Sequence, residues 1–421
     1  MSFETISVIG LGYIGLPTAA MFASRKKKVI GIDVNQHAVD TINRGEIHIV
    51  EPELDMIVHA AVTEGYLKAA VTPEPADAFL IAVPTPFKNN DSEIPEPDLS
   101  YIEAASKAIA PVLKKGDLVI LESTSPVGAT EQMAEWLAAA RKDLTFPQAE
   151  GNASDIRIAH CPERVLPGHV VRELVENDRV IGGLTAKCSE AAIELYKTFV
   201  EGECVTTSAR TAEMAKLTEN SCRDVQIAFA NELSVICDKL NIDVWELISL
   251  ANRHPRISIL QPGPGVGGHC IAVDPWFIVS KTPNEAQIIH TARKVNDSKP
   301  NWVIDKVKVA VTEFLQANPK KTARDVTIAC YGLAFKANID DLRESPAQHI
   351  ATEIAEFNVG TTLFVEPNIQ ELPKNIPNGR LVEIDTAETE AHIHVLLVDH
   401  NEFKLVKPKF EYLVDTKGVW L

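Results

Sequence analysis

Several common features are missing from this sequence, and each absence removes a class of protein. No apolar run reaches the ~18 residues that a membrane-spanning helix needs, so we expect no membrane insertion. The seven cysteines show no CxxC spacing, which argues against a disulfide framework and against a zinc site. No low-complexity tract is present, and no basic leader precedes the first strand-like run, so we expect a cytoplasmic protein with reduced thiols.

Positive charge is also scarce. The formal net charge is −17, which argues against general binding to nucleic acid or anionic lipid, because phosphate polymers attract basic surfaces. A small anionic ligand would need local cations. Two clusters supply them, Arg253 with Arg256 and Lys336 with Arg343.

The chain of 421 residues is long enough for two or three domains. Short apolar strands alternate with helical runs in its first half and again near its end, which predicts an α/β protein with mostly parallel sheets. We expect two Rossmann-like doubly wound domains joined by a central long-helix domain. The predicted boundaries are 1–208, 209–318 and 319–421.

A dinucleotide fingerprint opens the chain. The strand at 5–9 leads into the turn Gly10-Leu11-Gly12-Tyr13-Ile14-Gly15 and a helix, and the strand at 28–32 ends at Asp33. Glycines in this setting allow close approach of a pyrophosphate, and the acid suits ribose hydroxyls. Asp33 would repel a 2′-phosphate and residues 34–36 include no arginine, so NAD is favoured over NADP.

Polar groups follow three later strands, where ligands bind in parallel sheets. They are Thr85 between two prolines, Glu122-Ser123-Thr124, and Cys161-Pro162-Glu163-Arg164 with Val165 next to it. One such end is ordinary turn chemistry, whereas three together indicate a site.

A long helical segment without proline or glycine follows at 212–251, with a possible interruption near 239–241. Lys216, Asn220 and Arg223 lie on one face of it by their spacing. That face is either a solvated charged stripe or the lining of a cavity. The segment is also a candidate dimer interface.

The loop at 262–275 is the centre of the predicted site. It holds four glycines within six positions and then Cys270 and Asp274, four residues apart. A cysteine whose pKa is lowered forms a thiolate that adds to carbonyl carbon. An isolated cysteine is more often buried and structural, so this interpretation depends on the surrounding motifs.

Another helix is predicted from Lys299-Pro300 to Leu315, and then a second α/β unit. Its strands are predicted at 326–331, 362–365, 393–398 and 412–414, its helix at 345–357, and a surface loop at 373–379. Its first turn lacks the full glycine fingerprint but carries Lys336, with Arg343 close behind. Such cations suit phosphate oxygens.

Together these motifs resemble the UDP-glucose/GDP-mannose dehydrogenase family over essentially the whole chain. The run 161–168 and the run 256–277 look most like the bacterial branch that oxidises UDP-N-acetyl-D-mannosamine and supplies a uronic acid for surface polysaccharides such as enterobacterial common antigen. The position of a second glutamate in UDP-glucose enzymes is Pro167 here, which disfavours UDP-glucose as substrate.

The resemblance implies a two-step oxidation of a sugar C6 alcohol to a carboxylate with two NAD⁺. Lys216, or a water near Asp274, would take the alcohol proton, and Cys270 would form a thiohemiacetal and then a thioester. Lys216 and Asn220 would stabilise the oxyanion, and Asp274, Thr124 or Glu163 would orient the hydrolytic water.

Binding roles follow from the same resemblance. The cofactor would contact Gly10, Gly12, Tyr13, Ile14, Gly15, Asp33, Thr85, Thr124 and Arg343. The UDP-sugar would contact Arg164, Val165, Lys216, Asn220, Arg223, His254, Arg256, Gly267 and Lys336. The patch 253–256 could reach across a homodimer. No metal is expected.

Three alternatives stay open. The enzyme could be a UDP-N-acetylglucosamine 6-dehydrogenase, which differs at one stereocentre. It could be a single-step NAD-dependent hydroxyacid dehydrogenase, although that chemistry needs no cysteine. A non-catalytic NAD sensor is disfavoured by the joint presence of Lys216, Asn220, Cys270 and Asp274.

Overall fold

The chain forms two compact units in the computed structural model. The model describes residues 3–49, 51–90, 92–165, 168–268, 270–374, 376–406 and 409–420. The first unit comprises Met1–Glu219 with Trp276–Thr282, and the second comprises Asn220–Pro275 with Pro283–Leu421.

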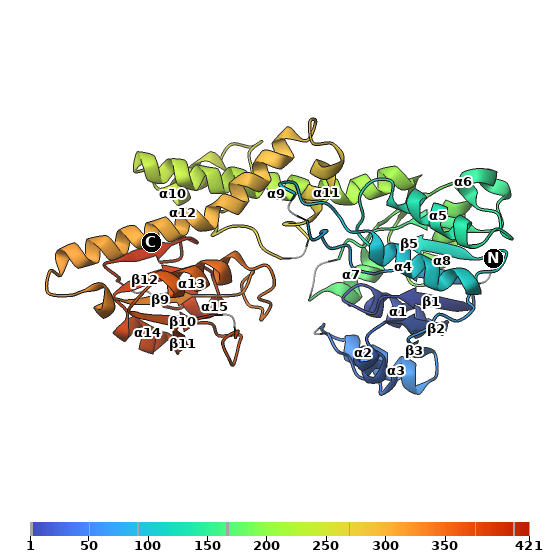
Figure 1. Cartoon of the computed structure of the whole chain (residues 1–421), viewed down its shortest axis with the longest axis horizontal. Helices are drawn as coiled ribbons and strands as arrows, with labels where there is room; N and C mark the ends of the chain where they lie inside the picture. Colours follow the sequence, from blue (N-terminus) through green and yellow to red (C-terminus); the bar gives the residue numbers. More distant parts are fainter. Residues whose placement is uncertain are drawn as a thin grey trace. The chain divides into compact units, whose positions relative to one another are not determined.

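The first unit is built on an eight-stranded sheet in the order β3-β2-β1-β4-β5-β6-β7-β8 (Figure 1). Its strands are β1 Thr5–Ile9, β2 Lys28–Ile32, β3 Leu67–Ala70, β4 Ala78–Ile81, β5 Leu118–Leu121, β6 Arg157–His160, β7 Arg179–Gly183 and β8 Cys204–Ser208. Neighbours pair in parallel except β6 and β7, which are antiparallel. The mostly parallel sheet is confirmed, whereas β3 was not predicted.

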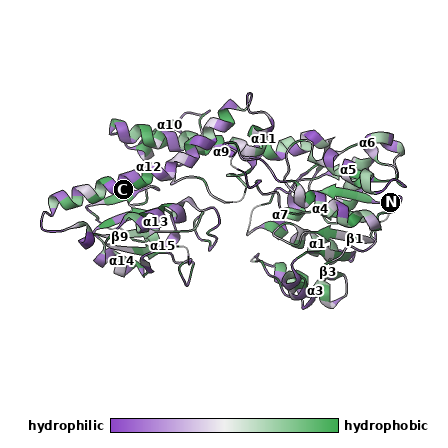
Figure 2. Cartoon of the chain, viewed as in Figure 1, coloured by the Kyte–Doolittle hydropathy of each residue, from purple (hydrophilic) through white to green (hydrophobic). Residues whose placement is uncertain are grey.

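Helices cover both faces of this sheet, as the doubly wound prediction requires. They are α1 Gly15–Ser24, α2 Gln36–Asn43, α3 Leu54–Thr63, α4 Ser100–Ile109, α5 Ala129–Ala140, α6 Pro147–Glu150, α7 Val170–Glu176 and α8 Ala186–Tyr196, with short 3₁₀ turns at Ala110–Val112 and Gly151–Ala153. One buried cluster joins α1, α3, α7 and α8 to the sheet, and a second joins α4 and α5 to its other face. The strands are accordingly drawn in hydrophobic colours in Figure 2.

The long helical segment is α9 Ala209–Leu240 followed by α10 Val244–Ala251. The predicted interruption lies where expected: Asn241 takes a positive φ of 52°, and the Asp243 side chain caps α10 by accepting N–H bonds from Trp245 and Glu246.

Helix α11 Asp274–Lys281 comes next, and then α12 Gln287–Ala317. The predicted helix start at Lys299-Pro300 is wrong, because Pro300 lies inside α12. Proline is frequent at the first position of a helix but lies here in the interior of one. The turns before Pro300 are held by tertiary bonds instead, including the buried ion pair of Arg293 with Asp224 at 2.6 Å.

The second unit contains a five-stranded parallel sheet in the order β11-β10-β9-β12-β13. Its elements are β9 Thr327–Tyr331, α13 Pro346–Phe357, β10 Thr361–Val365, β11 Gly379–Leu381, α14 Ile384–Glu390, β12 Ile393–Leu396, α15 Asn401–Lys404 and β13 Leu413–Asp415, with a 3₁₀ turn at Ala323–Asp325. Four strands were predicted to within two residues, and β11 was not. Part of α12 packs on this sheet through Val303, Val307 and Phe314.

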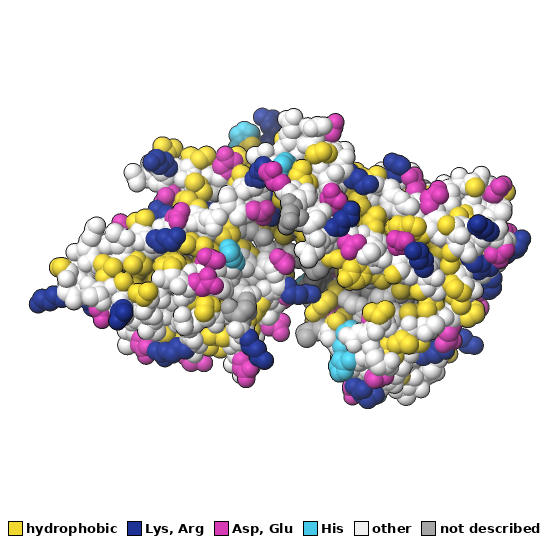
Figure 3. Space-filling view, in the orientation of Figure 1, with side chains coloured by type: hydrophobic (Ala, Val, Ile, Leu, Met, Phe, Trp, Pro, Cys, Tyr) yellow, Lys and Arg dark blue, Asp and Glu magenta, His cyan; other side chains and the backbone are white. Residues whose placement is uncertain are grey.

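Two further observations bear on partners. Among the described residues, no helix combines the length and apolar character that a membrane crossing requires. Cationic and anionic side chains are interspersed over the face drawn in Figure 3.

Candidate active site

The glycine turn between β1 and α1 has the geometry of a ligand cradle. Gly10 takes a φ of +91°, and a Cβ there would lie 2.6 Å from the Ala82 carbonyl oxygen. A Cβ on Gly15 would lie 1.8 Å from the Gly10 carbonyl oxygen, so both positions exclude side chains. Nothing lies within 4 Å of a Cβ built on Gly12. Space is therefore open above Gly12, where a pyrophosphate would approach.

The carboxylate of Asp33 supports this turn. Its Oδ2 accepts the Leu11 N–H at 2.9 Å, and its Oδ1 accepts the Asn35 N–H at 2.8 Å. The predicted ribose ligand is thus also a brace for the glycine turn. Tyr13 is 39% exposed beside it, and Ile14 is half-buried at the start of α1.

Thr85 and Thr124 follow β4 and β5, as predicted. Thr85 is buried, and its hydroxyl has no hydrogen-bond partner among the described residues. Thr124 is half-buried beside Ser123, whose hydroxyl donates to the Val83 carbonyl at 2.7 Å. A buried hydroxyl without a partner, three residues after the Ala82 backbone that touches Gly10, fits a bound dinucleotide.

Glu163 lies in a buried polar cluster that the sequence indicated only in part. Its Oε1 accepts the Arg164 N–H at 2.7 Å, and its Oε2 pairs with the Arg179 guanidinium at 2.8 Å. Beyond Arg179, the Tyr196 hydroxyl donates to Glu122 at 2.5 Å. Arg179 and Tyr196 were missed: the position of Arg179 depends on the antiparallel register of β7 against β6, and Tyr196 reaches Glu122 from the end of α8, 74 positions later in the chain.

Two predicted catalytic residues meet within the second unit. The Asn220 amide donates to Oδ2 of Asp274 at 2.5 Å, and Asp274 is buried. Lys216 is half-buried and lies one turn earlier on the same face of α9. Cys270 is exposed, and its carbonyl accepts the Asp274 N–H at 2.9 Å at the start of α11.

The glycines before Cys270 let its loop lie directly against the β9–α13 connection. A Cβ on Gly267 would lie 2.5 Å from the Glu344 carbonyl oxygen and 2.6 Å from the Pro346 ring. Gly268 has a φ of +82°, and its Cβ would touch the Phe335 ring at 3.0 Å. The glycine content of this loop therefore has a packing cause. His269, in the same motif, lies outside the described residues.

A buried polar chain anchors the start of this loop. The Asn231 side chain on α9 accepts the Gly263 N–H at 2.9 Å and donates to Asn296 on α12 at 2.9 Å. Asn296 in turn donates to the Asp224 carboxylate at 2.8 Å, and Arg293 pairs with that carboxylate. All four side chains are buried, and none was predicted as a site residue.

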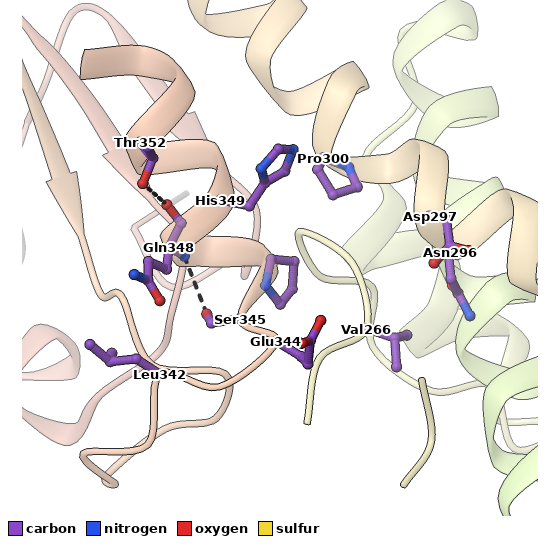
Figure 4. Close-up of a pocket in the computed structure, with 11 residues that line it drawn as sticks. Val266, Asn296, Asp297, Pro300, Leu342, Glu344, Ser345, Gln348, His349 and Thr352 are labelled. Atoms are coloured by element: carbon purple, nitrogen blue, oxygen red, sulfur yellow. Dashed lines mark hydrogen bonds between the residues drawn. The ribbon is translucent and has the colours of Figure 1, made fainter. Parts of the chain in front are cut away.

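A cavity of about 430 Å³ lies beside the loop, within the second unit. Figure 4 shows Val266 of the loop, Pro300 of α12 and the first turn of α13 around it. Ser345 caps α13 by accepting the Gln348 N–H at 3.2 Å. Arg343 and Lys336 belong to the same connection but do not line this cavity.

The remaining predicted contacts are mostly exposed. Arg164 pairs with Glu219 at 2.7 Å, and Arg343 pairs with Asp341 at 2.6 Å. Val165 is half-buried, whereas Arg223, His254, Arg256 and Lys336 are exposed. Pro167 lies outside the described residues.

Glu213 does not lie on a solvated face. It is buried, and its carboxylate accepts the N–H groups of Gly128 and Thr130 at 2.6 and 2.8 Å. Because these are orphan donors at the start of α5, Glu213 caps that helix.

No group of three metal-ligating side chains is found among the described residues. Family models match the chain in three consecutive segments. They are the NAD binding domain of the UDP-glucose/GDP-mannose dehydrogenase family at residues 4–200, its central domain at 210–298 and its UDP binding domain at 329–420. The chain therefore belongs to the UDP-glucose/GDP-mannose dehydrogenase family, and the predicted resemblance and NAD cofactor are confirmed.

Relatives extend over the full length. The chain is 68% identical to a UDP-N-acetyl-D-mannosamine dehydrogenase of Yersinia pestis, with 100% of both chains covered. It is 63% identical to an NDP-N-acetyl-D-galactosaminuronic acid dehydrogenase of Ralstonia nicotianae, covering 100% of this chain and 97% of that one. A solved UDP-D-ManNAc dehydrogenase from Pyrococcus horikoshii matches with a TM-score of 0.85 at 36% identity, covering 99% and 96%.

Proposed function

We propose that this enzyme oxidises the C6 hydroxyl of UDP-N-acetyl-D-mannosamine to a carboxylate, giving UDP-N-acetyl-D-mannosaminuronate. The choice of sugar is supported by the 68% identity, over the full length of both chains, to an enzyme named UDP-N-acetyl-D-mannosamine dehydrogenase. The relative named for N-acetylgalactosaminuronic acid, at 63%, makes the galacto sugar a second candidate. A third candidate substrate, UDP-N-acetylglucosamine, differs from UDP-N-acetylmannosamine only in the configuration at C2.

The chemistry is carried by one observation, the exposed Cys270 on an anchored loop that leads directly into the Asp274–Asn220 pair. When bound, NAD⁺ would supply the hydride acceptor for each of the two oxidations. Lys216, or a water held at Asp274, takes the alcohol proton. The Cys270 thiolate then adds to the aldehyde carbon, and Lys216 and Asn220 stabilise the resulting oxyanion.

After the second oxidation, the carbon is a thioester on Cys270 Sγ. Water attacks the thioester and its protons pass by way of the orienting carboxylate to solvent; the C–S bond breaks, the carboxylate product leaves, and the Cys270 thiolate is regenerated. Asp274, Thr124 or Glu163 orients that water. The two anchored carboxylates, Asp274 and Glu163, are suited to this because their hydrogen bonds fix their orientation.

The binding roles are extended from the same family. Gly10, Gly12, Gly15 and Asp33 would hold NAD with Thr85 and Thr124, and Arg343 would face its phosphates. Lys336, Gly267 and the cations near 253–256 would receive the UDP moiety, and Arg164, Val165 and Arg223 the sugar. We also propose that the chain has three domains, with boundaries after residues 208 and 318.

We also propose a homodimer. Phe229, Ile236 and Leu240 on α9 are 52%, 43% and 60% exposed and lie on one helix face, and Leu250 of α10 is 59% exposed. Burying such a stripe against a second copy would remove it from water. No disulfide forms among the seven cysteines, all of which lie within the described residues; this supports a cytoplasmic location, where the uronic acid product would enter surface polysaccharide synthesis.

The test is NADH formed per nucleotide sugar consumed, on UDP-linked N-acetylmannosamine, N-acetylglucosamine, N-acetylgalactosamine and glucose. We expect two NADH on the manno substrate and little on the others. Cys270→Ser should stop at or before one NADH, whereas Cys222→Ser, at another exposed thiol, should keep two. Two NADH from Cys270→Ser would exclude the thiol relay, and two on another sugar would change the substrate.

A further inference from the structure

A buried cluster of five ionisable side chains lies at the carboxyl edge of the first sheet. It comprises Glu122 after β5, Cys161 and Glu163 after β6, Arg179 at the start of β7 and Tyr196 at the end of α8, each at most 6% exposed. Because β7 runs antiparallel to β6, continuing their register past His160 sets Arg179 level with Glu163. The cluster is therefore a product of the one antiparallel pairing in that sheet.

The side chains form a continuous chain of contacts. The Arg179 guanidinium pairs with Glu163 at 2.8 Å and lies over the Tyr196 ring, 4.9 Å from its centroid. The Tyr196 hydroxyl donates to Oε1 of Glu122 at 2.5 Å. The other oxygen of Glu122 is buried and has no partner among the described residues. Arg179 thus contacts the Tyr196 ring and forms an ion pair with Glu163, so it links the two side chains.

The charges of the cluster are unequal, with one guanidinium against two carboxyls. Ionising both carboxyls would bury a net negative charge, which is costly in a dry environment. Burial accordingly raises the pKa of Glu122 to about 7, against the opposing effects of Arg179 and Tyr196. Burial also raises the pKa of Cys161 to about 12, so this thiol is inert.

We propose that Tyr196 and Glu122 are positioning residues for Glu163, acting through Arg179, and that they thereby support hydrolysis of the covalent intermediate. This inference rests on the proposed function, in which Glu163 orients the hydrolytic water. Glu163 reaches water through its remaining 6% exposure, while Arg179 and the Arg164 N–H fix its two oxygens.

The first test separates hydrolysis from the oxidations. Tyr196→Phe removes the hydroxyl but leaves the ring under Arg179, and Tyr101→Phe makes the same change at a side chain 48% exposed on α4. Enzyme is mixed rapidly with UDP-N-acetylmannosamine and excess NAD⁺. For Tyr196→Phe we expect the two-NADH burst per subunit to persist while steady turnover falls about tenfold, the value of one such hydrogen bond. Intact mass should show the uronyl adduct on Cys270, and Tyr101→Phe should behave as wild type.

The second test uses Glu122→Gln, which keeps the acceptor for Tyr196 but cannot ionise. In the wild type, ionisation of Glu122 adds a second carboxylate to Arg179 and weakens its hold on Glu163. The ratio of Glu122→Gln to wild-type turnover should therefore be near one at about pH 6 and rise above about pH 7. Cys161, Tyr196, Arg179 and Glu163 are the other ionisable groups facing this carboxyl.

Glu163→Gln distinguishes the two levels of the proposal. If it fails to accumulate the adduct, the hydrolytic role of Glu163 is wrong. Suppose instead that Glu163→Gln accumulates the adduct. If Tyr196→Phe then loses both the NADH burst and the steady turnover, or keeps both, the positioning inference is wrong while the proposed function stands. A pH-independent ratio for Glu122→Gln would also overturn it.

Discussion

Gly267→Ala tests whether the cysteine loop must lie against the β9–α13 connection. The added methyl would sit 2.5 Å from the Glu344 carbonyl oxygen, whereas ordinary contact begins near 3.4 Å. The loop must therefore retreat by roughly 1 Å, since the Glu344 backbone and the Pro346 ring are not flexible side-chain ends. A displacement of about 1 Å at a reacting group can cost ~100-fold in rate. We expect kcat to fall by about that factor.

The matched control lies in the same loop. Among the described residues, the atom nearest to a Cβ on Gly263 would be Lys417 Nζ at 3.8 Å, so Gly263→Ala should be accommodated. Both variants are assayed by NADH release under saturating substrates and by thermal unfolding. Because the strain is confined to one loop, Gly267→Ala should lower kcat strongly while its unfolding temperature stays close to that of the wild type. Equal kcat for Gly267→Ala and wild type, or an equal loss in Gly263→Ala, would refute the packing argument.

Three further predictions follow from other contacts. Arg293→Ala leaves Asp224 buried without its cation and should lower the free energy of unfolding by about 3–5 kcal/mol, whereas Arg172→Ala, in the exposed pair with Glu176, should change it by less than about 0.5 kcal/mol in denaturant titrations. Burial alone would raise the pKa of Glu366, but the bonds from His400 and the Leu333 amide hold it at about 2. A carboxyl whose pKa is lower in the folded than in the unfolded state stabilises the fold at pH values above its unfolded-state pKa, and this stabilisation is lost as the pH falls. The free energy of unfolding should therefore drop between about pH 4 and pH 2, and Glu366→Gln should flatten that slope in acid unfolding. Phe229→Glu places a charge in the exposed stripe of α9 and should give a monomer by light scattering; an unchanged dimer would move the interface elsewhere.

Local patterns were enough to predict most of the fold. The strand–glycine–helix–acid pattern at the start of the chain and the alternation after it correspond to β1, α1, β2 and the following strands. Short edge strands were missed, because β3 and β11 have weak apolar patterns and exist through pairing with β2 and β10. The error at Pro300 has a related cause: helix α12 passes through proline because distant side chains secure its earlier turns.

The sequence predicts candidate site residues, but it does not predict which of them the structure brings together. Helical spacing relates Lys216 to Asn220, but no pattern relates Asn220 to Asp274, 54 positions later, which the structure joins by a hydrogen bond. Arg179 begins a strand with an ordinary β pattern. Its contact with Glu163 depends on the antiparallel direction of that strand, which the neighbouring residues do not indicate. The Asn231–Asn296 link is likewise long-range, and buried asparagines carry no local signal.

The packing of Gly267 on Phe335, Glu344 and Pro346 also bears on how the enzyme is made. A ribosome synthesises the dinucleotide-binding segment first, and such segments fold as they emerge. The thiol at Cys270 follows, yet the surface that shapes its loop is completed only after Pro346 has been added. A nascent chain, or one that is cut short before that point, would therefore carry a cysteine without a formed site. In the proposed mechanism, the thiol of Cys270 would therefore become functional only after the segment that ends at Pro346 has folded.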